Sequence, residues 1–200
     1  MPMVPATLQA DILNIFYAMN SIYQDGDVYQ ASEMAKAIKK YILTGVVATA
    51  DVGVAPAGSY TGTGVGTMTI DADVLANDLL ATFLTRYTNN DLADHMATDI
   101  DNACAEAGTV KTTSNGTAVI PSGGTASFSG PGEGKFAGNK STIATALKTC
   151  FSTMNTMSQG GNEYYAAQFA AAIHSYLTAG TINVILKPLF ASGTGVGKIA

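Results

Sequence analysis

The stretch from Phe16 to Gly45, FYAMNSIYQDGDVYQASEMAKAIKKYILTG, occurs a second time from Phe151 to Gly180, as FSTMNTMSQGGNEYYAAQFAAAIHSYLTAG. At a constant shift of 135 positions, 12 of the 30 residues are identical without a gap. Average residue usage gives roughly two or three identities by chance over such a length. We infer that the first and last thirds of the chain share an ancestor.

The middle third is more diverged but has the same order of features. Four residues recur at a shift of 67 and three more at a shift of 62: Leu8, Asp11, Leu13 and Phe16 as Leu75, Asp78, Leu80 and Phe83, and Met34, Ala35 and Ile38 as Met96, Ala97 and Ile100. Each third continues with a Gly, a Thr/Val-rich stretch and a Pro: Gly45 and Pro56, Gly108 and Pro121, Gly180 and Pro188. Self-similarity of this kind is typical of repeated supersecondary units. The sequence therefore predicts three tandem repeats, at 1–70, 71–136 (diverged) and 137–200.

The first half of each repeat reads as two helices. In the first repeat, Leu8, Ile12 and Met19 fall on one helical face, and a similar apolar stripe follows Met34. The residues 24–26, Gln-Asp-Gly, are typical of the turn between two helices. Gly45 is expected to end the second helix in a left-handed conformation, which costs glycine least.

The second half of each repeat reads as a β-hairpin. Residues 46–54 alternate and are β-branched, residues 56–58 form a Pro-Ala-Gly turn, and residues 60–70 return as a Gly-rich strand. The predicted fold class is α+β, three tandem repeats that each consist of an αα-hairpin followed by a Gly-rich β-hairpin. The repeats can pack as one globular domain with pseudo-threefold symmetry, or they can lie in a row. The sequence leaves both arrangements open, because an apolar helix face indicates that the face is buried but does not identify the element that covers it.

Each repeat closes with alternating glycines, and these form the predicted repeat and assembly motif: Gly62, Gly64, Gly66, Gly130, Gly132, Gly134, Gly193, Gly195 and Gly197. A dinucleotide-binding fingerprint is G-x-G-x-x-G between a strand and a helix, and the spacing here is G-x-G-x-G. We interpret the glycines as structural residues that permit close backbone approach, bulges or flat packing against another strand. Gly-rich strand edges are expected to join a neighbour's sheet by strand addition.

The candidate chemical residues are few. The densest ionisable cluster lies on one predicted helix, where His95 and Asp99 have the i, i+4 spacing of a metal-binding pair: Asp91, Asp94, His95, Asp99 and Asp101. Two ligands do not make a site, so we interpret the cluster as a solvated helix face. His174 is expected to be exposed, as the counterpart of Lys39, and Cys104 to be a small buried hydrophobe. The sequence predicts no catalytic residue, metal site or cofactor.

Tyrosines occupy equivalent places in the first and third repeats: Tyr29, Tyr41, Tyr164 and Tyr176. The first interpretation is core packing in which each hydroxyl reaches a partner, and the second is an aromatic platform for sugars.

The composition and charge of the chain argue against several classes of function. Only 12% of residues are charged and the formal net charge is −5, so the cationic footprint that a nucleic-acid partner requires is missing. The most apolar stretch, 166–190, is interrupted by polar residues and falls short of a bilayer span. The first residues lack the basic and apolar regions of a secretory signal.

Three features together carry a resemblance: the Met-Asn-x-x-x-Gln-x-Gly hairpin that begins at Met19, the Ala35-Lys-Ala-Ile38 helix and the closing Gly-Thr-Gly-Val-Gly. Charge-poor, Ala/Thr/Gly-rich chains of this pattern resemble virion structural proteins of tailed bacteriophages. The resemblance implies a non-enzymatic head, neck or tail component located in the virion. Its implied partners are other copies of itself, as a homo-oligomer, and other virion proteins.

Two alternatives remain at this point. One is a binding module, such as an adhesin or decoration domain, that recognises carbohydrate or a host surface through Tyr/Thr/Asn-rich loops. The other is an enzyme that uses the region from Asp91 to Asp101.

Overall fold

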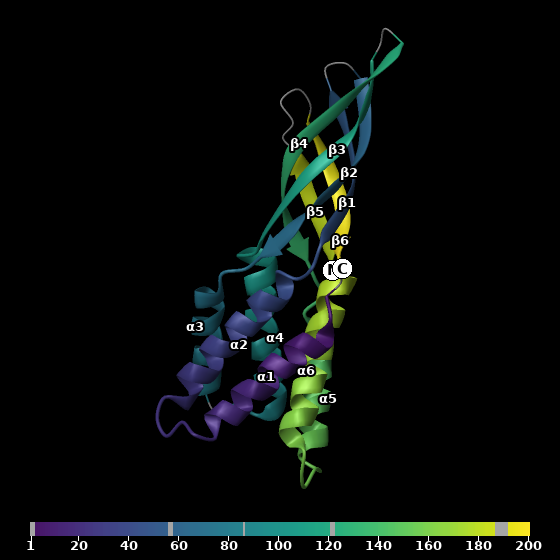
Figure 1. Cartoon of the computed structure of the whole chain (residues 1–200). Coiled ribbons are helices and arrows are strands. Elements are labelled where there is room, and N and C mark those ends of the chain that lie inside the picture. Colours follow the sequence, from purple (N-terminus) through teal and green to yellow (C-terminus); the bar gives the residue numbers. More distant parts are fainter. Residues whose placement is uncertain (1–2, 56–57, 86, 121–122, 187–191) are drawn as a thin grey trace.

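The computed structural model describes residues 3–55, 58–85, 87–120, 123–186 and 192–200. It has two layers, with the helices at one end and the strands at the other (Figure 1). The mixture of helix and sheet confirms the predicted α+β class. Pro56, Pro121 and Pro188, where the sequence predicts turns or breaks, lie outside the described residues.

Along the chain, two helices are followed by two strands three times, with one short π-helix, η1, in the middle third. The elements are α1 (Pro5–Met19), α2 (Gly26–Ile42), β1 (Val47–Ala55), β2 (Gly58–Thr69), α3 (Ala72–Leu84), α4 (Asn89–Asp101), η1 (Asn102–Glu106), β3 (Thr109–Ile120), β4 (Gly124–Ala137), α5 (Ser141–Met154), α6 (Gly161–Ala179), β5 (Thr181–Leu186) and β6 (Ser192–Ile199).

Helix α1 shows how the apolar stripe becomes structure. Pro5 stands at its start, where a missing N–H costs nothing, and Leu8, Ile12 and Ile15 are buried along one face. The turn from α1 to α2 passes through Asp25 in a left-handed conformation (φ 58°), and the turn from α5 to α6 passes through Gly160 in the same region (φ 74°). Asp25 and Gly160 stand at equivalent positions, since they differ by the same 135 residues as the two stretches above.

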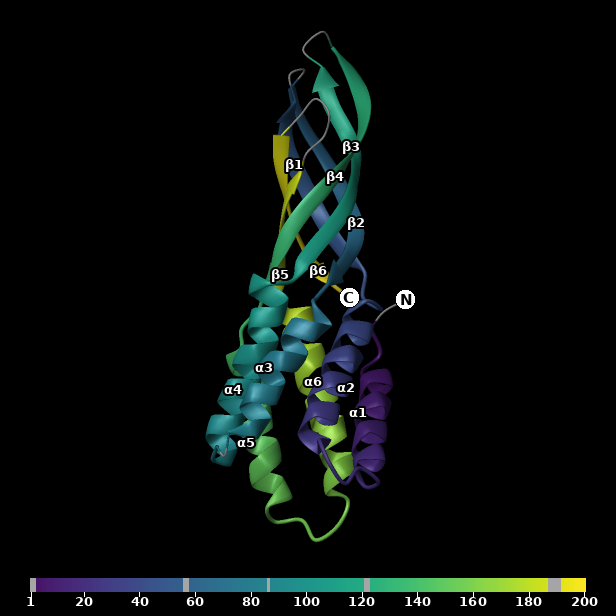
Figure 2. The same cartoon turned by 90° about the vertical axis from the view of Figure 1, so that its left-hand side faces the viewer.

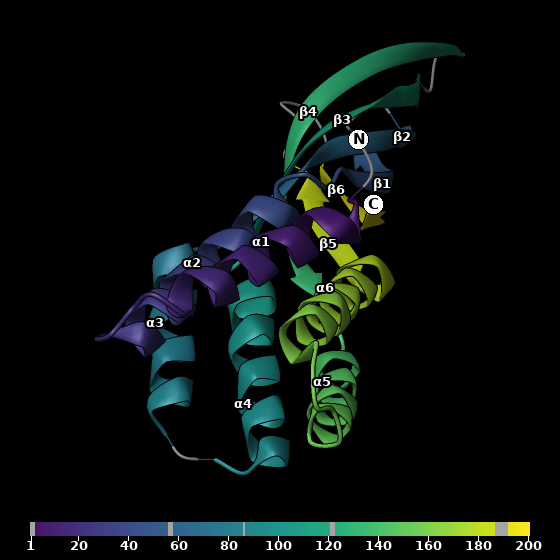
Figure 3. The same cartoon turned by 60° about the horizontal axis from the view of Figure 1, so that its bottom comes forward.

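The six helices form a closed ring in chain order, because α6 packs against α1 as well as against α5 (Figure 3). The closing contact includes the edge of Phe16 on the ring of Tyr165, with centroids 5.2 Å apart, and a 2.8 Å hydrogen bond from Tyr17 to Glu163. Within the described ranges, no helix combines the length and the apolar character needed to cross a membrane.

The six strands form one closed antiparallel barrel in the order β1-β2-β3-β4-β5-β6, with β6 paired to β1 (Figure 2). This differs from the expectation of hairpins with open Gly-rich edges, because each strand pairs along part or all of its length with two neighbours. The β3–β4 hairpin is the longest, with 12 and 14 residues against 6 and 8 for β5 and β6, and reaches farthest from the helices in Figure 1.

The glycines that follow the second helices do not have the predicted left-handed conformation. Among the described glycines, only Gly58, Gly123 and Gly160 have positive φ. A Cβ at Gly45 would instead lie 2.6 Å from the Cγ1 atom of Ile199, and one at Gly180 would overlap the ring of Phe136. The side chain is absent because the chain passes close to the barrel base there.

Candidate functional site

The inside of the barrel is built by a simple alternation. Because side chains on a strand point alternately to the two faces, the glycines of the three triplets lie on the inward rows of β2, β4 and β6. The inward side chains between them come from β1, β3 and β5. Asp51, for example, pairs with Gly62 on one side and Gly195 on the other, and Thr112 pairs with Gly66 and Gly132.

At the level of the glycine triplets, a six-stranded barrel is too narrow to hold a side chain from every strand. A Cβ at Gly197 would overlap the carbonyl oxygen of Ala48, and a Cβ at Gly66 would overlap that of Lys111. The glycines therefore permit close backbone approach, as the sequence predicted. Strand addition at the Gly-rich strands is corrected for β2 and β6, whose glycine triplets pair with a strand on both sides, as does the part of β4 from Gly132 onward.

A cluster of polar side chains occupies the middle of the barrel. We call it the lumen cluster, and it consists of Thr49, Asp51, Tyr60, Thr112 and Ser114, each at most 5% exposed. The hydroxyl of Thr49 donates to one carboxylate oxygen of Asp51 at 2.7 Å, and the hydroxyl of Ser114 donates to the other at 2.5 Å. The hydroxyls of Tyr60 and Thr112 are buried and have no hydrogen-bond partner among the described residues.

The outer face of the barrel is almost without charge. The charged outward residues of the described strands are Lys111, Glu133, Lys135 and Lys198. Lys135 donates to the carbonyl oxygens of Glu106 and Gly108, at the helix end of the barrel. The rest of the face consists largely of threonine and serine with exposed aliphatic side chains, which are Val52, Val54, Val65, Val119, Ile185 and Val196.

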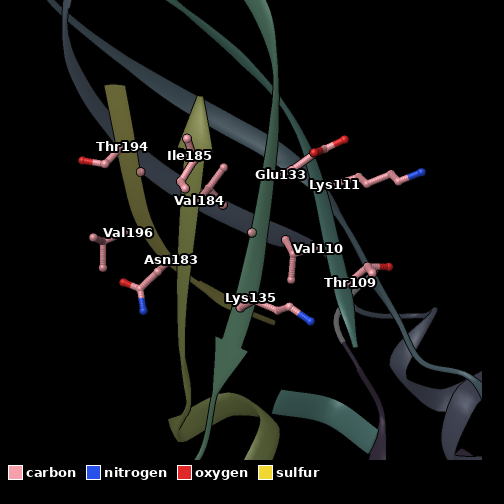
Figure 4. Close-up of a pocket in the computed structure, with 12 residues that line it drawn as sticks. Thr109, Val110, Lys111, Glu133, Lys135, Asn183, Val184, Ile185, Thr194 and Val196 are labelled. Atoms are coloured by element: carbon pink, nitrogen blue, oxygen red, sulfur yellow. The ribbon is translucent and has the colours of Figure 1, made fainter. Parts of the chain in front are cut away.

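A pocket of about 810 Å³ lies on the barrel, across β3, β4, β5 and β6 (Figure 4). Val196 and Ile185 contribute apolar surface, and Asn183, Lys111 and Glu133 contribute polar groups. The concave surface could accept a side chain or a small ligand.

A second pocket, of about 480 Å³, lies among the helices. Phe16, Phe83 and Phe151 all line it, and these are the three residues that the sequence comparison placed at equivalent positions. They come from α1, α3 and α5, so the first helix of every third contributes one ring.

The ionisable cluster of α4 separates in the structure. Asp94 forms an ion pair with Lys148 of α5 at 2.7 Å, and Asp91 bonds to the capping residue Thr88. His95 is exposed and stacks on Tyr87 at 4.1 Å. In the part of the chain that the structure describes, no three His, Cys, Asp or Glu side chains converge.

The other two acids of this cluster correct the interpretation as a solvated face. Asp99 is half-buried and accepts a 2.7 Å hydrogen bond from Thr82 of α3, and burial raises the pKa of Asp99. Asp101 accepts a 2.6 Å hydrogen bond from Tyr176 of α6. These two carboxylates connect α4 to its neighbours in the fold.

The tyrosines fit the core interpretation where they are buried. Tyr41 and Tyr176 are at most 2% exposed and both hydroxyls have partners, at His174 and Asp101. His174 is half-buried through this 2.8 Å contact of its Nδ1 atom, which corrects the expectation of an exposed side chain.

Both cysteines are buried and free, as predicted for Cys104. Burial raises the pKa of Cys104 to about 12 and that of Cys150 to about 11. Both side chains are therefore thiols at neutral pH.

Comparison with protein-family models, with curated proteins and with solved structures finds no similar family, relative or fold.

Sequence reasoning missed the lumen cluster. Asp51 belongs to no motif, and its neighbours Tyr60 and Ser114 are distant in sequence. One signal was present, because Asp51 is the only acidic or basic residue between Val46 and Ile70 and its strand alternates. A single charge on the buried row of a strand must have a polar environment, since an unpaired buried charge is costly.

Proposed function

We propose that this protein is a non-enzymatic structural component of a bacteriophage virion, in the head, neck or tail, and that it acts through protein–protein contacts of the barrel exterior. The partners we propose are other copies of the chain and other virion proteins. The observation that carries the proposal is the charge-poor outer face of β1 to β6 with its six exposed aliphatic side chains.

Physical chemistry favours an interface for such a face. Protein surfaces are normally rich in Lys, Arg, Glu and Asp, and the central parts of interfaces are depleted in them. The outward threonines and valines are short, so they lose little side-chain entropy when a partner covers them.

The experiment measures mass by light scattering over a dilution series. We expect the wild type to form oligomers, and the double variant Val65→Glu and Val196→Glu to remain monomeric with an unchanged circular dichroism spectrum. The matched control is Val28→Glu, an exposed valine of α2, which should assemble like the wild type. A wild type that is monomeric at every concentration contradicts the self-association.

We also propose that the chain consists of three tandem copies of one ααββ unit, at 1–70, 71–136 and 137–200. A pattern of hydrogen bonds supports this. Tyr41 of α2 bonds to His174 of α6, and Tyr176 of α6 bonds to Asp101 of α4. His174 and Asp101 both correspond to Lys39 in the sequence comparison, so each of these two tyrosines contacts the same position in another unit.

A second candidate is a binding module such as an adhesin or decoration domain. The pocket across β3 to β6 favours it, because Asn183, Lys111 and Glu133 surround apolar side chains. Such a module predicts a folded monomer that binds defined sugars on a glycan array, and binding that is lost in Asn183→Ala. A blank array contradicts this candidate.

A further inference from the structure

The lumen cluster contains a carboxylate, that of Asp51, whose charge no cationic side chain balances within the part of the chain that the structure describes. Asp51 is 1% exposed, and its hydrogen bonds come from two neutral hydroxyls. Among the described residues, no cationic side chain lies within ion-pair distance of it, and the barrel lysines Lys111, Lys135 and Lys198 are all exposed. A buried and ionised carboxylate normally requires a cation, since its isolated charge is strongly disfavoured.

Only some of the hydroxyl groups in the lumen cluster have a hydrogen-bond partner among the described residues. The hydroxyls of Tyr60 and Thr112 are completely buried without a hydrogen-bond partner, which is rare for polar groups in native structures. Burial raises the pKa of the Tyr60 phenol, and the charge of nearby Asp51 raises it further. The Asp51 carboxylate, the two hydroxyls that contact it and the two unpartnered hydroxyls of the same barrel interior are hard oxygen ligands, which alkali and alkaline-earth cations prefer.

We propose that the barrel lumen binds one monovalent cation, Na⁺ or K⁺, through the carboxylate of Asp51 and the hydroxyl oxygens of the lumen cluster. A single positive charge neutralises the single carboxylate. The hydroxyls of Thr49 and Ser114 can donate to Asp51 and still present lone pairs to the ion. Tyr60 and Thr112 supply oxygens that have no other partner, so the cation completes the hydrogen-bonding and charge requirements of the cluster together.

Apolar side chains lie along the barrel interior on both sides of the lumen cluster. On the side away from the helices, the ring of Tyr60 contacts Phe128 with centroids 4.2 Å apart. On the helix side, Val47 and Met68 are fully buried. A cation in this position exchanges slowly, so the protein should be refolded in each salt before measurement.

The test compares melting temperatures in NaCl, KCl and choline chloride at equal ionic strength. Choline is too large for the lumen, so it controls for screening. We expect the melting temperature of the wild type to rise with Na⁺ or K⁺ by about 3–5 °C for each tenfold increase above the dissociation constant, and not with choline. Equal melting temperatures in the three salts overturn the proposal.

Variants test whether the cation-dependent rise in melting temperature arises in the barrel lumen. Asp51→Asn keeps the shape and removes the charge, so we expect it to lose the cation response and to melt no lower than the wild type in choline chloride. Asp11→Asn is the matched control, because Asp11 forms a surface ion pair with Lys40, and it should respond like the wild type. If Asp51→Asn does not fold, Ser114→Ala serves instead and should weaken the response.

Crystals grown in RbCl provide a direct readout. An anomalous peak within bonding distance of the Asp51 carboxylate supports the site. Density for a water molecule alone, without an anomalous peak, overturns a K⁺ site, because Rb⁺ is close to K⁺ in size; a Na⁺ site is overturned if crystals grown in NaCl show only a water with ordinary hydrogen-bond distances there. This outcome is independent of assembly, so it leaves the proposed function unaffected.

Discussion

At the scale of single residues, the interior of the barrel is filled by large side chains that lie opposite glycines. Each large inward side chain of β1, β3 or β5 pairs with glycine on at least one neighbouring strand, and Leu186 pairs with Gly132 and Gly193 on both sides. A substitution at an inward glycine therefore acts on a specific neighbour. Where that neighbour is backbone, nothing can move aside without breaking the strand pairing.

We expect Gly197→Ala to lower the free energy of unfolding by at least about 2 kcal/mol, because the new Cβ would overlap the carbonyl oxygen of Ala48 in the paired strand. Urea denaturation followed by circular dichroism measures the change. Gly161→Ala is the control, since the nearest atom to its Cβ is the Cε of Met154 at 3.6 Å, and its stability should change by less than about 1 kcal/mol. Equal stabilities for the two variants would refute the steric role.

Tyr41 makes the stability dependent on alkaline pH. Burial raises the pKa of Tyr41 to about 12, whereas a phenol in an unfolded chain ionises near ~10. The folded state therefore holds this proton more tightly, and the resulting stabilisation is complete below pH ~10 and lost as the pH rises towards ~12. Urea denaturation across this interval should show a smaller loss for Tyr41→Phe than for the wild type. Tyr23→Phe, at a 97% exposed side chain, should keep the wild-type profile.

At the scale of elements, η1 explains a discontinuity in the sequence comparison. Ile100 follows Ile38 by 62 positions, but Gly108 follows Gly45 by 63, so the middle third has one additional residue between them. The π-helix from Asn102 to Glu106 lies in this interval, where the amide of Ala107 bonds to the carbonyl of Asn102 at 3.0 Å. A π-turn accommodates one inserted residue within a helix.

Deletion of Ala105 should therefore convert η1 into an ordinary helical turn. We expect this variant to fold, with a melting temperature within about 4 °C of the wild type, because Gly108 then has the same offset as Gly45. Deletion of Leu43 is the comparison, since α2 has no inserted residue, and it should lower the melting temperature by more than about 10 °C. Calorimetry measures both. Equal losses would show that η1 is not an insertion.

At the scale of the whole molecule, the sequence predicts the elements but not their closure. The spacing of Leu8, Ile12 and Ile15 predicts α1, and the alternation of residues 46–54 predicts β1, because both patterns are local. Closure depends on pairs such as Val47 with Ile199, which are separated by almost the entire chain. The neighbours of Asp51 in the lumen cluster could not be predicted for the same reason, since they come together only once the barrel has closed.

Closure makes a circular permutant possible. Met3 and Ile199 both lie against Gly45, so a short linker can join the two ends (Figure 1). A chain that begins at Asp71 and ends at Ile70 should have the wild-type circular dichroism spectrum and melt within about 5 °C of it. A permutant opened between Glu133 and Gly134, inside β4, should lose cooperative melting. An unfolded Asp71 permutant would contradict the proposal that the boundary between units 1–70 and 71–136 is equivalent to the new boundary at the joined ends.

The long β3–β4 hairpin makes one side of the barrel different from the others. If the three proposed ααββ units are arranged alike around the barrel, a partner seated over the end of the barrel has three almost equal choices of rotation. The projecting ends of β3 and β4 remove this ambiguity, because they extend beyond the other strands on one side only. A partner that contacts these strand ends can therefore bind at one angle only, even if the rest of its binding surface cannot distinguish the three units.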